Sequence, residues 1–216
     1  AGEHDARRPG TDHRHAHWFW LSDGDTMGRR ETAGESQKPG PVTDLVLWVP
    51  DAGGIPEEFL PAVIGVRSLA RLRESLKGYV PAALHLQALG SVADVFPEGY
   101  AVSARWQSST PMLTDRHPKK RKDPAVFIRR EIERELAFRP WGGVAPQVVS
   151  VQVQSTWLSD PGGRSGVQGY RRYRLGESMA QRRLGFRVIF EVDRPIPGPV
   201  SLGALSHFGF GRFSAI

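Results

Sequence analysis

Short segments with strand-like alternation dominate this sequence, and helical spacing occurs in only two segments, 54–79 and 123–138. Alternating apolar residues indicate β-strands, whereas apolar residues three or four positions apart indicate helices. The elements follow the order strand, strand, helix, strand, strand, helix, and then four more strands. Strands are expected at 15–21, 42–50, 82–89, 100–113 and 146–155, within 160–178, at 183–192 and at 200–213. This order predicts an α+β fold with an antiparallel sheet.

The middle of this order, β-α-β-β-α-β, matches the ferredoxin-like topology of RNA-recognition motifs. The strands left over extend that sheet or form a second, degenerate copy. In the second case the main domain, 15–216, divides into two similar halves, near 15–113 and 114–216. Residues 1–14 are polar and aperiodic, which is typical of a tail or the stub of a linker.

The segment 123–138 has the strongest helical pattern in the chain. Asp123 is a good N-cap residue, and a proline suits the first turn that follows it. The buried stripe is expected to comprise Ala125, Ile128, Ile132 and Leu136. Arg129 and Arg130 are left for solvent or for a ligand.

The chain has 216 residues and no cysteine, which suits one large domain or two small ones and excludes disulfides and thiolate metal ligands. No apolar run has membrane-spanning length, and no secretory signal pattern is visible. A cytoplasmic protein that does not enter a membrane is therefore expected. Because the sequence starts at Ala1 without methionine, a piece of a longer polypeptide is also expected.

Basic charge is concentrated in the second half of the chain. Residues 1–60 carry 6 lysines and arginines against 11 acidic residues, whereas residues 116–216 carry 18 against 8. Most of these cations are arginines, whose planar guanidinium pairs well with phosphate. A polyanionic partner is the first inference, and nucleic acid is the commonest one. A soluble basic protein without such a partner is the alternative.

Three histidines, His13, His15 and His17, fall at every second position beside the first expected strand. On a strand, all three side chains would point to the same face. Such imidazoles bind Zn²⁺, Ni²⁺ or Cu²⁺, or act as general acids and bases because their ordinary pKa is about 6.5. No carboxylate stands at a convincing ligand spacing, so a metal site ranks last and no cofactor is expected. A polar tail is the alternative, and it suits His13 best.

Two further segments combine cations with features that suit phosphate. In 114–124, Pro118 extends a basic loop that leads into a helix N-terminus, a favourable place for an anion. In 168–174, arginines alternate with tyrosines, which stack on bases while guanidiniums hold phosphates. A solvated loop and a charged edge strand are the alternatives, and the combination of the two segments favours binding. The candidate RNA-binding side chains are Arg116, Arg121, Lys122, Arg129, Arg130, Tyr170, Arg171, Arg172, Arg174, Arg182 and Arg183.

The chain closes on 198–213, where four glycines and His207 stand among leucines and phenylalanines. Glycine permits a positive φ or the close approach of another group, but it weakens a strand. We therefore expect a ligand to approach this backbone, with Gly203, Gly209 and Gly211 as contact points.

Three motifs are informative in combination. They are the His-x-His strand, the Thr-Pro…Arg-His-Pro-Lys-Lys loop at 110–120, and the terminal Gly-Pro-x-x-Leu-Gly…Ser-His-Phe-Gly-x-Gly at 198–211. Together they closely resemble the CRISPR type I-U (I-G) subunit that fuses a Cas-five-like part to a Cas-six-like part, and the resemblance covers residues 12–213. It implies a Cas-six-like endoribonuclease that cuts CRISPR repeat RNA into guide RNAs and retains the product. Its implied partners are that RNA, the Cas-five-like half and other effector-complex subunits.

The chemistry that this resemblance implies needs no metal. A 2′-OH attacks its own 3′ phosphate and leaves a 2′,3′-cyclic phosphate and a 5′-OH, which requires a base, an acid and cations around the phosphorane. His15 or His17 is the expected base, with His207 as its partner or substitute, and Lys119 or Lys120 would stabilise the phosphorane. A non-catalytic subunit that holds guide RNA with the same arginines is the alternative, and a histidine metalloenzyme is the third hypothesis.

Overall fold

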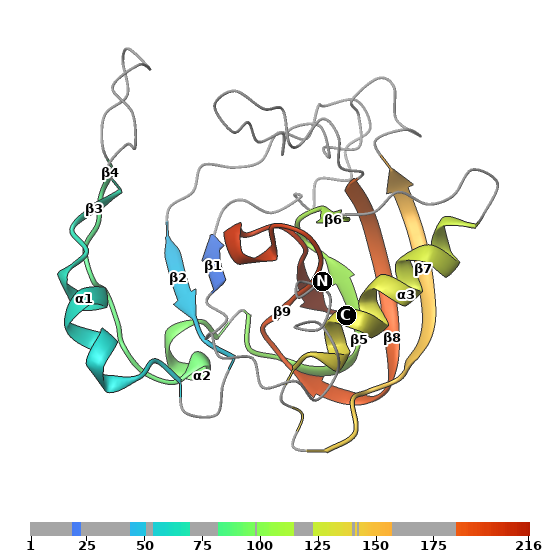
Figure 1. The fold of residues 1–216 in the computed structure, drawn as a ribbon, viewed down its shortest axis with the longest axis horizontal. Coiled ribbons are helices and arrows are strands. Elements are labelled where there is room, and N and C mark those ends of the chain that lie inside the picture. The colour runs from blue at the N-terminus through green and yellow to red at the C-terminus, as the bar shows by residue number, and fades with distance from the viewer. Residues whose placement is uncertain are drawn as a thin grey trace, which may run out of the picture.

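The centre of the molecule is a six-stranded antiparallel sheet in an α+β fold, as the sequence predicts (Figure 1). The computed structural model describes residues 19–22, 44–50, 54–69, 82–97, 99–114, 123–139, 141, 143–156 and 185–216. The strands of the central sheet are β5 (Val102–Ser108), β6 (Met112–Leu113), β7 (Val148–Thr156), β8 (Gly185–Pro197), β9 (Val200–Ser201) and β10 (Arg212–Ala215). The long strand β8 pairs with β7 along one edge and with β5 and then β6 along the other. On the far side of β5, β10 lies between β5 and β9.

The helix α3 (Pro124–Ala137) joins β5 and β6 to β7 and covers one face of the sheet (Figure 1). The Asp123 side chain accepts a hydrogen bond of 2.9 Å from the Ala125 amide, which confirms the expected N-cap. Ile128, Ile132 and Leu136 are fully buried, as expected, whereas Ala125, the fourth expected member of the stripe, is only partly buried. They pack against alternate residues of β8, namely Phe186, Val188, Phe190 and Val192, and against Trp106 of β5.

Shorter elements precede the central sheet. They are β1 (Phe19–Ser22), β2 (Leu45–Trp48), the 3₁₀ helix η2 (Glu57–Phe59), α1 (Leu60–Gly65), β3 (Ser68–Leu69), β4 (Ala82–Ala83) and α2 (Val92–Val95). β1 pairs with β2 and β3 pairs with β4, so each pair forms a small sheet of its own beside the central one (Figure 1). None of the helices in the described residues combines the length and the apolar character that crossing a membrane requires.

This arrangement corrects the expected β-α-β-β-α-β run. The strands expected at 42–50 and 82–89 become β2 and β4, which belong to the small sheets and not to the central one. A division of the chain at residue 113 would separate β5 and β6 from β8, with which both pair. The sequence pattern misses this because periodicity identifies strands but not their partners.

Two expected elements in the first half are shorter in the structure. The helix expected over 54–79 ends at Gly65, and the backbone is extended at Val66 with φ −68° and ψ 115°. No residue of α1 is buried, so packing does not support a longer helix. The strand expected at 82–89 ends at Ala83.

Two further expected strands are interrupted. The strand expected at 100–113 breaks between Ser108 and Met112, where Pro111 has no amide for the strand ladder. The strand expected at 200–213 is divided by the 3₁₀ helix η4 (Ser206–Phe208) into β9 and β10. β7 and β8 form where strands are expected at 146–155 and 183–192, and β8 extends five residues further, to Pro197.

Candidate functional site

Residues 198–213, called the closing segment below, lie against the connection between β5 and β6. The amide of Ser109 donates to the carbonyl of Arg212 over 2.8 Å, and the amide of Gly211 donates to Pro111 over 2.9 Å. Thr110 Oγ1 donates to the carbonyl of Gly209 over 2.8 Å. The closing segment is therefore fixed to the sheet by hydrogen bonds and is not a loose tail.

Two glycines of the closing segment are required by the packing of the chain on itself. Gly203 has a φ of +93°, and a Cβ there would lie 2.5 Å from the carbonyl oxygen of Leu113. Gly211 has a φ of +59°, and a Cβ there would lie 1.8 Å from the carbonyl oxygen of Leu202. A backbone does approach these glycines closely, as expected, but it belongs to the same chain. Packing of the chain on itself therefore accounts for glycine at both positions, and their contact with RNA remains a prediction.

The third expected contact point, Gly209, ends η4 in the left-handed conformation with a φ of +85°. Gly209 and Gly211 are both buried. Their contact with RNA remains a prediction of the sequence, while their local conformations explain why glycine is present.

His207 is the one expected catalytic residue within the described residues, and it lies in η4 at the turn of the closing segment. Its side chain is partly buried. β1 lies against η4, although the two are separated by most of the chain (Figure 1). The strand that follows the His-x-His motif in the sequence is therefore a neighbour of the turn that carries His207.

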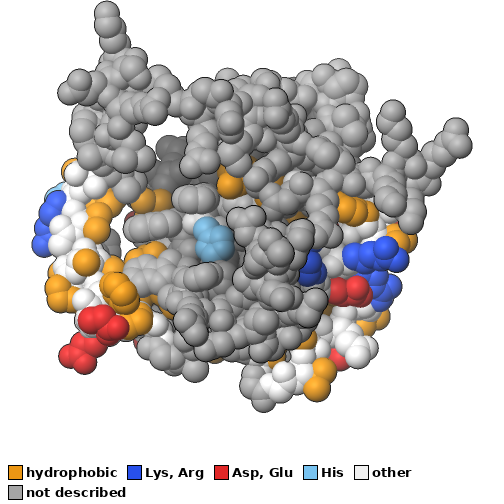
Figure 2. All heavy atoms as spheres, in the orientation of Figure 1, with side chains coloured by type: hydrophobic (Ala, Val, Ile, Leu, Met, Phe, Trp, Pro, Cys, Tyr) orange, Lys and Arg blue, Asp and Glu red, His pale blue; other side chains and the backbone are white. Residues whose placement is uncertain are grey.

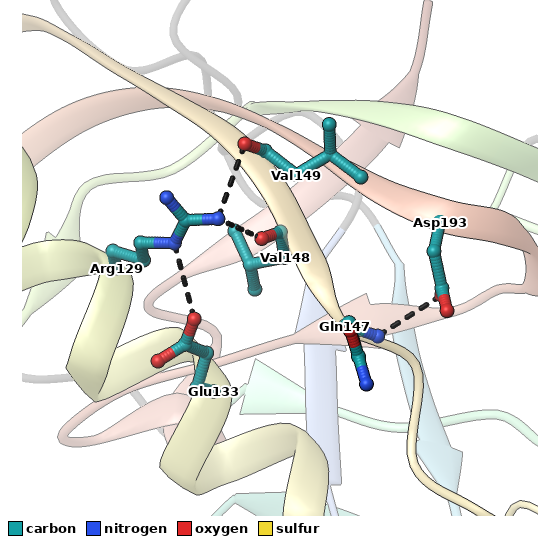
Figure 3. A network of polar contacts seen from close by, with 6 residues as sticks. All are labelled: Arg129, Glu133, Gln147, Val148, Val149 and Asp193. Atoms are coloured by element: carbon teal, nitrogen blue, oxygen red, sulfur yellow. Dashed lines mark hydrogen bonds and ion pairs between the residues drawn. The ribbon is translucent and has the colours of Figure 1, made fainter.

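The two expected RNA-binding arginines of α3 have different environments. Arg129 donates from Nη2 to the carbonyl oxygens of Val148 and Val149 in β7, the second over 3.1 Å, and from Nε to Glu133 over 3.1 Å (Figure 3). These bonds connect α3 to β7. The side chain of Arg130 is exposed. Arg130 is the more exposed of the two, although 43% of the Arg129 side chain is also open to solvent.

Two arginines that the sequence interpretation does not single out have prominent roles. Arg139 follows α3, donates to the carbonyl of Ser201 in β9, and lies 5.7 Å from the ring centroid of Trp48. Burial lowers the pKa of Arg139 to about 10, and the charge of Glu135 opposes part of that decrease. Arg212 is buried in β10, 5.6 Å from the ring centroid of Phe96. No local pattern reveals these contacts, because each aromatic partner is distant in the sequence.

The face of the central sheet opposite α3 is polar. Gln107 Nε2 donates to Gln154 Oε1 over 3.2 Å across β5 and β7, and Ser150 Oγ donates to Glu191 Oε2 over 3.4 Å. On the same strand as Glu191, the Nε of Arg187 is buried without a hydrogen-bond partner. The alternation of β8 in the sequence is the signal that assigns these residues to this face.

The remaining expected site residues lie outside the described residues. They are His15, His17, Lys119, Lys120, Arg116, Arg121, Lys122, Tyr170, Arg171, Arg172, Arg174, Arg182 and Arg183. On the face shown in Figure 2, blue basic side chains of the described part lie beside red acidic ones at the right, so their charge is mixed there. Within the same described part, no three histidine or acidic side chains gather as metal ligands would.

Comparisons with known proteins add no relative to this description. No protein-family model matches the chain, and the searches of curated proteins and of solved structures found no significant match.

Proposed function

We propose that this chain is a Cas-six-like endoribonuclease that cleaves CRISPR repeat RNA without a metal and retains the product. The motifs that carry the resemblance, and the excess of arginine in the second half, support this function. The cleavage would leave a 2′,3′-cyclic phosphate and a 5′-OH. The same surface would hold the product as a guide RNA for the other subunits of an effector complex.

The strand order of the central sheet supports a ferredoxin-like platform of the RNA-recognition-motif type. β5, α3 and β7 form a split β-α-β unit, because β8 lies between β5 and β7, and β10 pairs with the other edge of β5. The order β7-β8-β5-β10 is the one that a ferredoxin-like sheet requires. Here residues 198–211, which connect β8 to β10, occupy the place in the chain where the second helix of that fold would stand.

The contact between β1 and η4 is the observation that carries the catalytic part of the proposal. His15 and His17 precede Phe19, the first residue of β1, by four and two positions in the sequence. His207 lies in η4 itself. We infer that a base from the His-x-His motif and His207 act on one phosphodiester, one taking the proton of the 2′-OH and the other protonating the leaving oxygen.

Single substitutions of the histidines test this assignment. His15→Ala, His17→Ala and His207→Ala are compared with His85→Ala, whose side chain is exposed in the segment that follows β4. Loss of a general acid or base is expected to reduce single-turnover cleavage of a repeat RNA by about 10²–10⁴-fold. The His85 variant should cleave like the wild type. Wild-type rates in all three site variants would remove histidine from the mechanism.

The substrate controls distinguish cleavage from binding. The reaction is run in EDTA with a repeat RNA and with the same RNA carrying a 2′-deoxy nucleotide at the cleavage position, and the fragment ends are analysed. Cleavage of the first RNA alone, with cyclic phosphate ends, supports the endoribonuclease. Tight binding of both RNAs without cleavage would instead identify a non-catalytic guide-RNA-binding subunit.

A further inference from the structure

The β1–β2 hairpin forms a sheet separate from the central one, and no strand pairing among the described residues joins the two sheets. Val46 and Trp48 of β2 pack with Phe96, which follows α2. Phe96 is buried, while Val46 and Trp48 are partly buried. We call these three residues the hairpin cluster. Among the described side chains, this cluster joins the hairpin to the segment after α2.

Two arginines of the main body lie over the aromatic rings of the hairpin cluster. The guanidinium of Arg139 is 5.7 Å from the ring centroid of Trp48, and that of Arg212 is 5.6 Å from the ring centroid of Phe96. Both distances are within the range of a cation–π interaction, which strengthens where water is excluded. Arg139 is partly buried, and the desolvation of its guanidinium lowers its pKa to about 10.

Arg139 also contacts the strand that leads to His207. Its Nη2 donates to the carbonyl oxygen of Ser201 in β9. The hydroxyl of Ser201 lies 3.3 Å from the carbonyl oxygen of Ser206 and 3.1 Å from that of Phe210, so its single proton is shared between these two acceptors. These two carbonyls lie in η4 and shortly after it. The guanidinium of Arg139 therefore contacts both Trp48 of the hairpin cluster and Ser201. Ser201 in turn contacts the backbone at η4 and just after it.

The pairing of β1 with β2 extends this contact from Trp48 to β1. Trp48 is the pairing partner of Phe19, so the position that Arg139 contacts in β2 is next to the first residue of β1. β1 in turn lies against η4. We propose that Arg139 is a positioning residue, which holds the β1–β2 hairpin against β9 and η4 and thereby fixes the surroundings of His207. The consequence for cleavage rests on the proposed function, whereas the position of the hairpin does not.

Amide hydrogen exchange on the full chain tests the positioning directly. In Arg139→Met, exchange in β1, β2 and η4 is expected to accelerate by roughly tenfold, as loss of a desolvated cation–π contact predicts. Exchange in β7 and β8 should stay at the wild-type rate. Arg67→Met is the matched control, because Arg67 is exposed and donates to Ile64 of α1, within its own segment. Unchanged exchange in the hairpin, or equal acceleration in β7 and β8, would overturn the proposal.

A second variant separates the ring contact from the hydrogen bond. Trp48→Leu keeps the bond between Arg139 and Ser201 but removes the aromatic ring. It is expected to loosen β1 and β2 as much as Arg139→Met, and the double variant should loosen them little further, because either change alone already removes the contact between the guanidinium and the ring. Fully additive effects would show that the two side chains act independently and would contradict the proposal.

The cleavage assay then tests the functional consequence. Arg139→Met should lower the single-turnover rate of cleavage, while the Kd for repeat RNA stays within about twofold of the wild-type value. The reason is that the guanidinium of Arg139 positions η4 and does not itself contact the RNA. A variant with a loosened hairpin and a wild-type cleavage rate would show that His207 does not depend on Arg139. If the wild-type chain cleaves no RNA, the proposed function fails, and the exchange data still decide the positioning.

Discussion

Gly211 shows at the scale of a residue how the closing segment is built. Its φ of +59° belongs to the left-handed region, and the space where a Cβ would stand is occupied by the backbone of Leu202. The neighbouring hydrogen bond from the Leu202 amide to the Gly211 carbonyl, 2.8 Å long, holds the two strands of this turn together. The glycine is therefore part of the core and cannot be replaced without moving backbone.

Gly211→Ala is expected to destabilise the protein by at least about 2 kcal/mol, since it adds left-handed strain to overpacking against a fixed carbonyl. The free energy of unfolding in urea measures this change. Gly143→Ala is the matched control, because no neighbouring atom lies within 4 Å of the place where its Cβ would stand, and its φ is outside the left-handed region. Equal stabilities of the two variants would show that the turn around Gly211 is not rigid.

The α3 helix shows at the scale of an element what the sequence could and could not predict. Its N-cap at Asp123 and the burial of Ile128, Ile132 and Leu136 follow from local spacing, and the structure confirms both. The role of Arg129 could not be predicted, because its carbonyl partners Val148 and Val149 belong to β7. Local patterns predict which face of a helix is apolar, but not which strand that face meets.

The two adjacent arginines of α3 are expected to separate stability from binding. Arg129→Met should lower the free energy of unfolding by about 1 kcal/mol through its lost bonds to β7 and Glu133. Arg130→Met should leave stability within about 0.5 kcal/mol of the wild type, as an exposed change does, and weaken RNA binding. Urea unfolding and fluorescence anisotropy with labelled RNA measure the two quantities. The opposite pattern, with stability lost at Arg130, would contradict the contacts of α3.

The central sheet shows at the scale of the whole molecule why the topology could not be predicted from the element order. The strand types at 42–50, 146–155 and 183–192 are correct, yet only the last two join the central sheet. Fewer features of the candidate site than of the strands could be predicted from the sequence. His207 is identified from its motif, whereas Arg139 and Arg212 act through contacts with aromatic residues far away in the sequence.

The basic second half of the chain predicts a steep salt dependence of RNA binding. Each phosphate contact on a single strand is expected to contribute a slope of about −0.7 to log K against log salt, because counterions are released. Anisotropy titrations between low and moderate salt give this slope. A flat response would contradict the assignment of the arginines to phosphate.

The position of β10 has a consequence for how this protein is made. β10 lies between β5 and β9, and Phe213 pairs with Ser108, a residue synthesised far earlier. A nascent chain that has just emerged as far as β9 still lacks the strand that must be inserted beside β5. The sheet can therefore be completed only after translation of residues 212–215, and until then the edge of β5 that pairs with β10 stays open to wrong pairing.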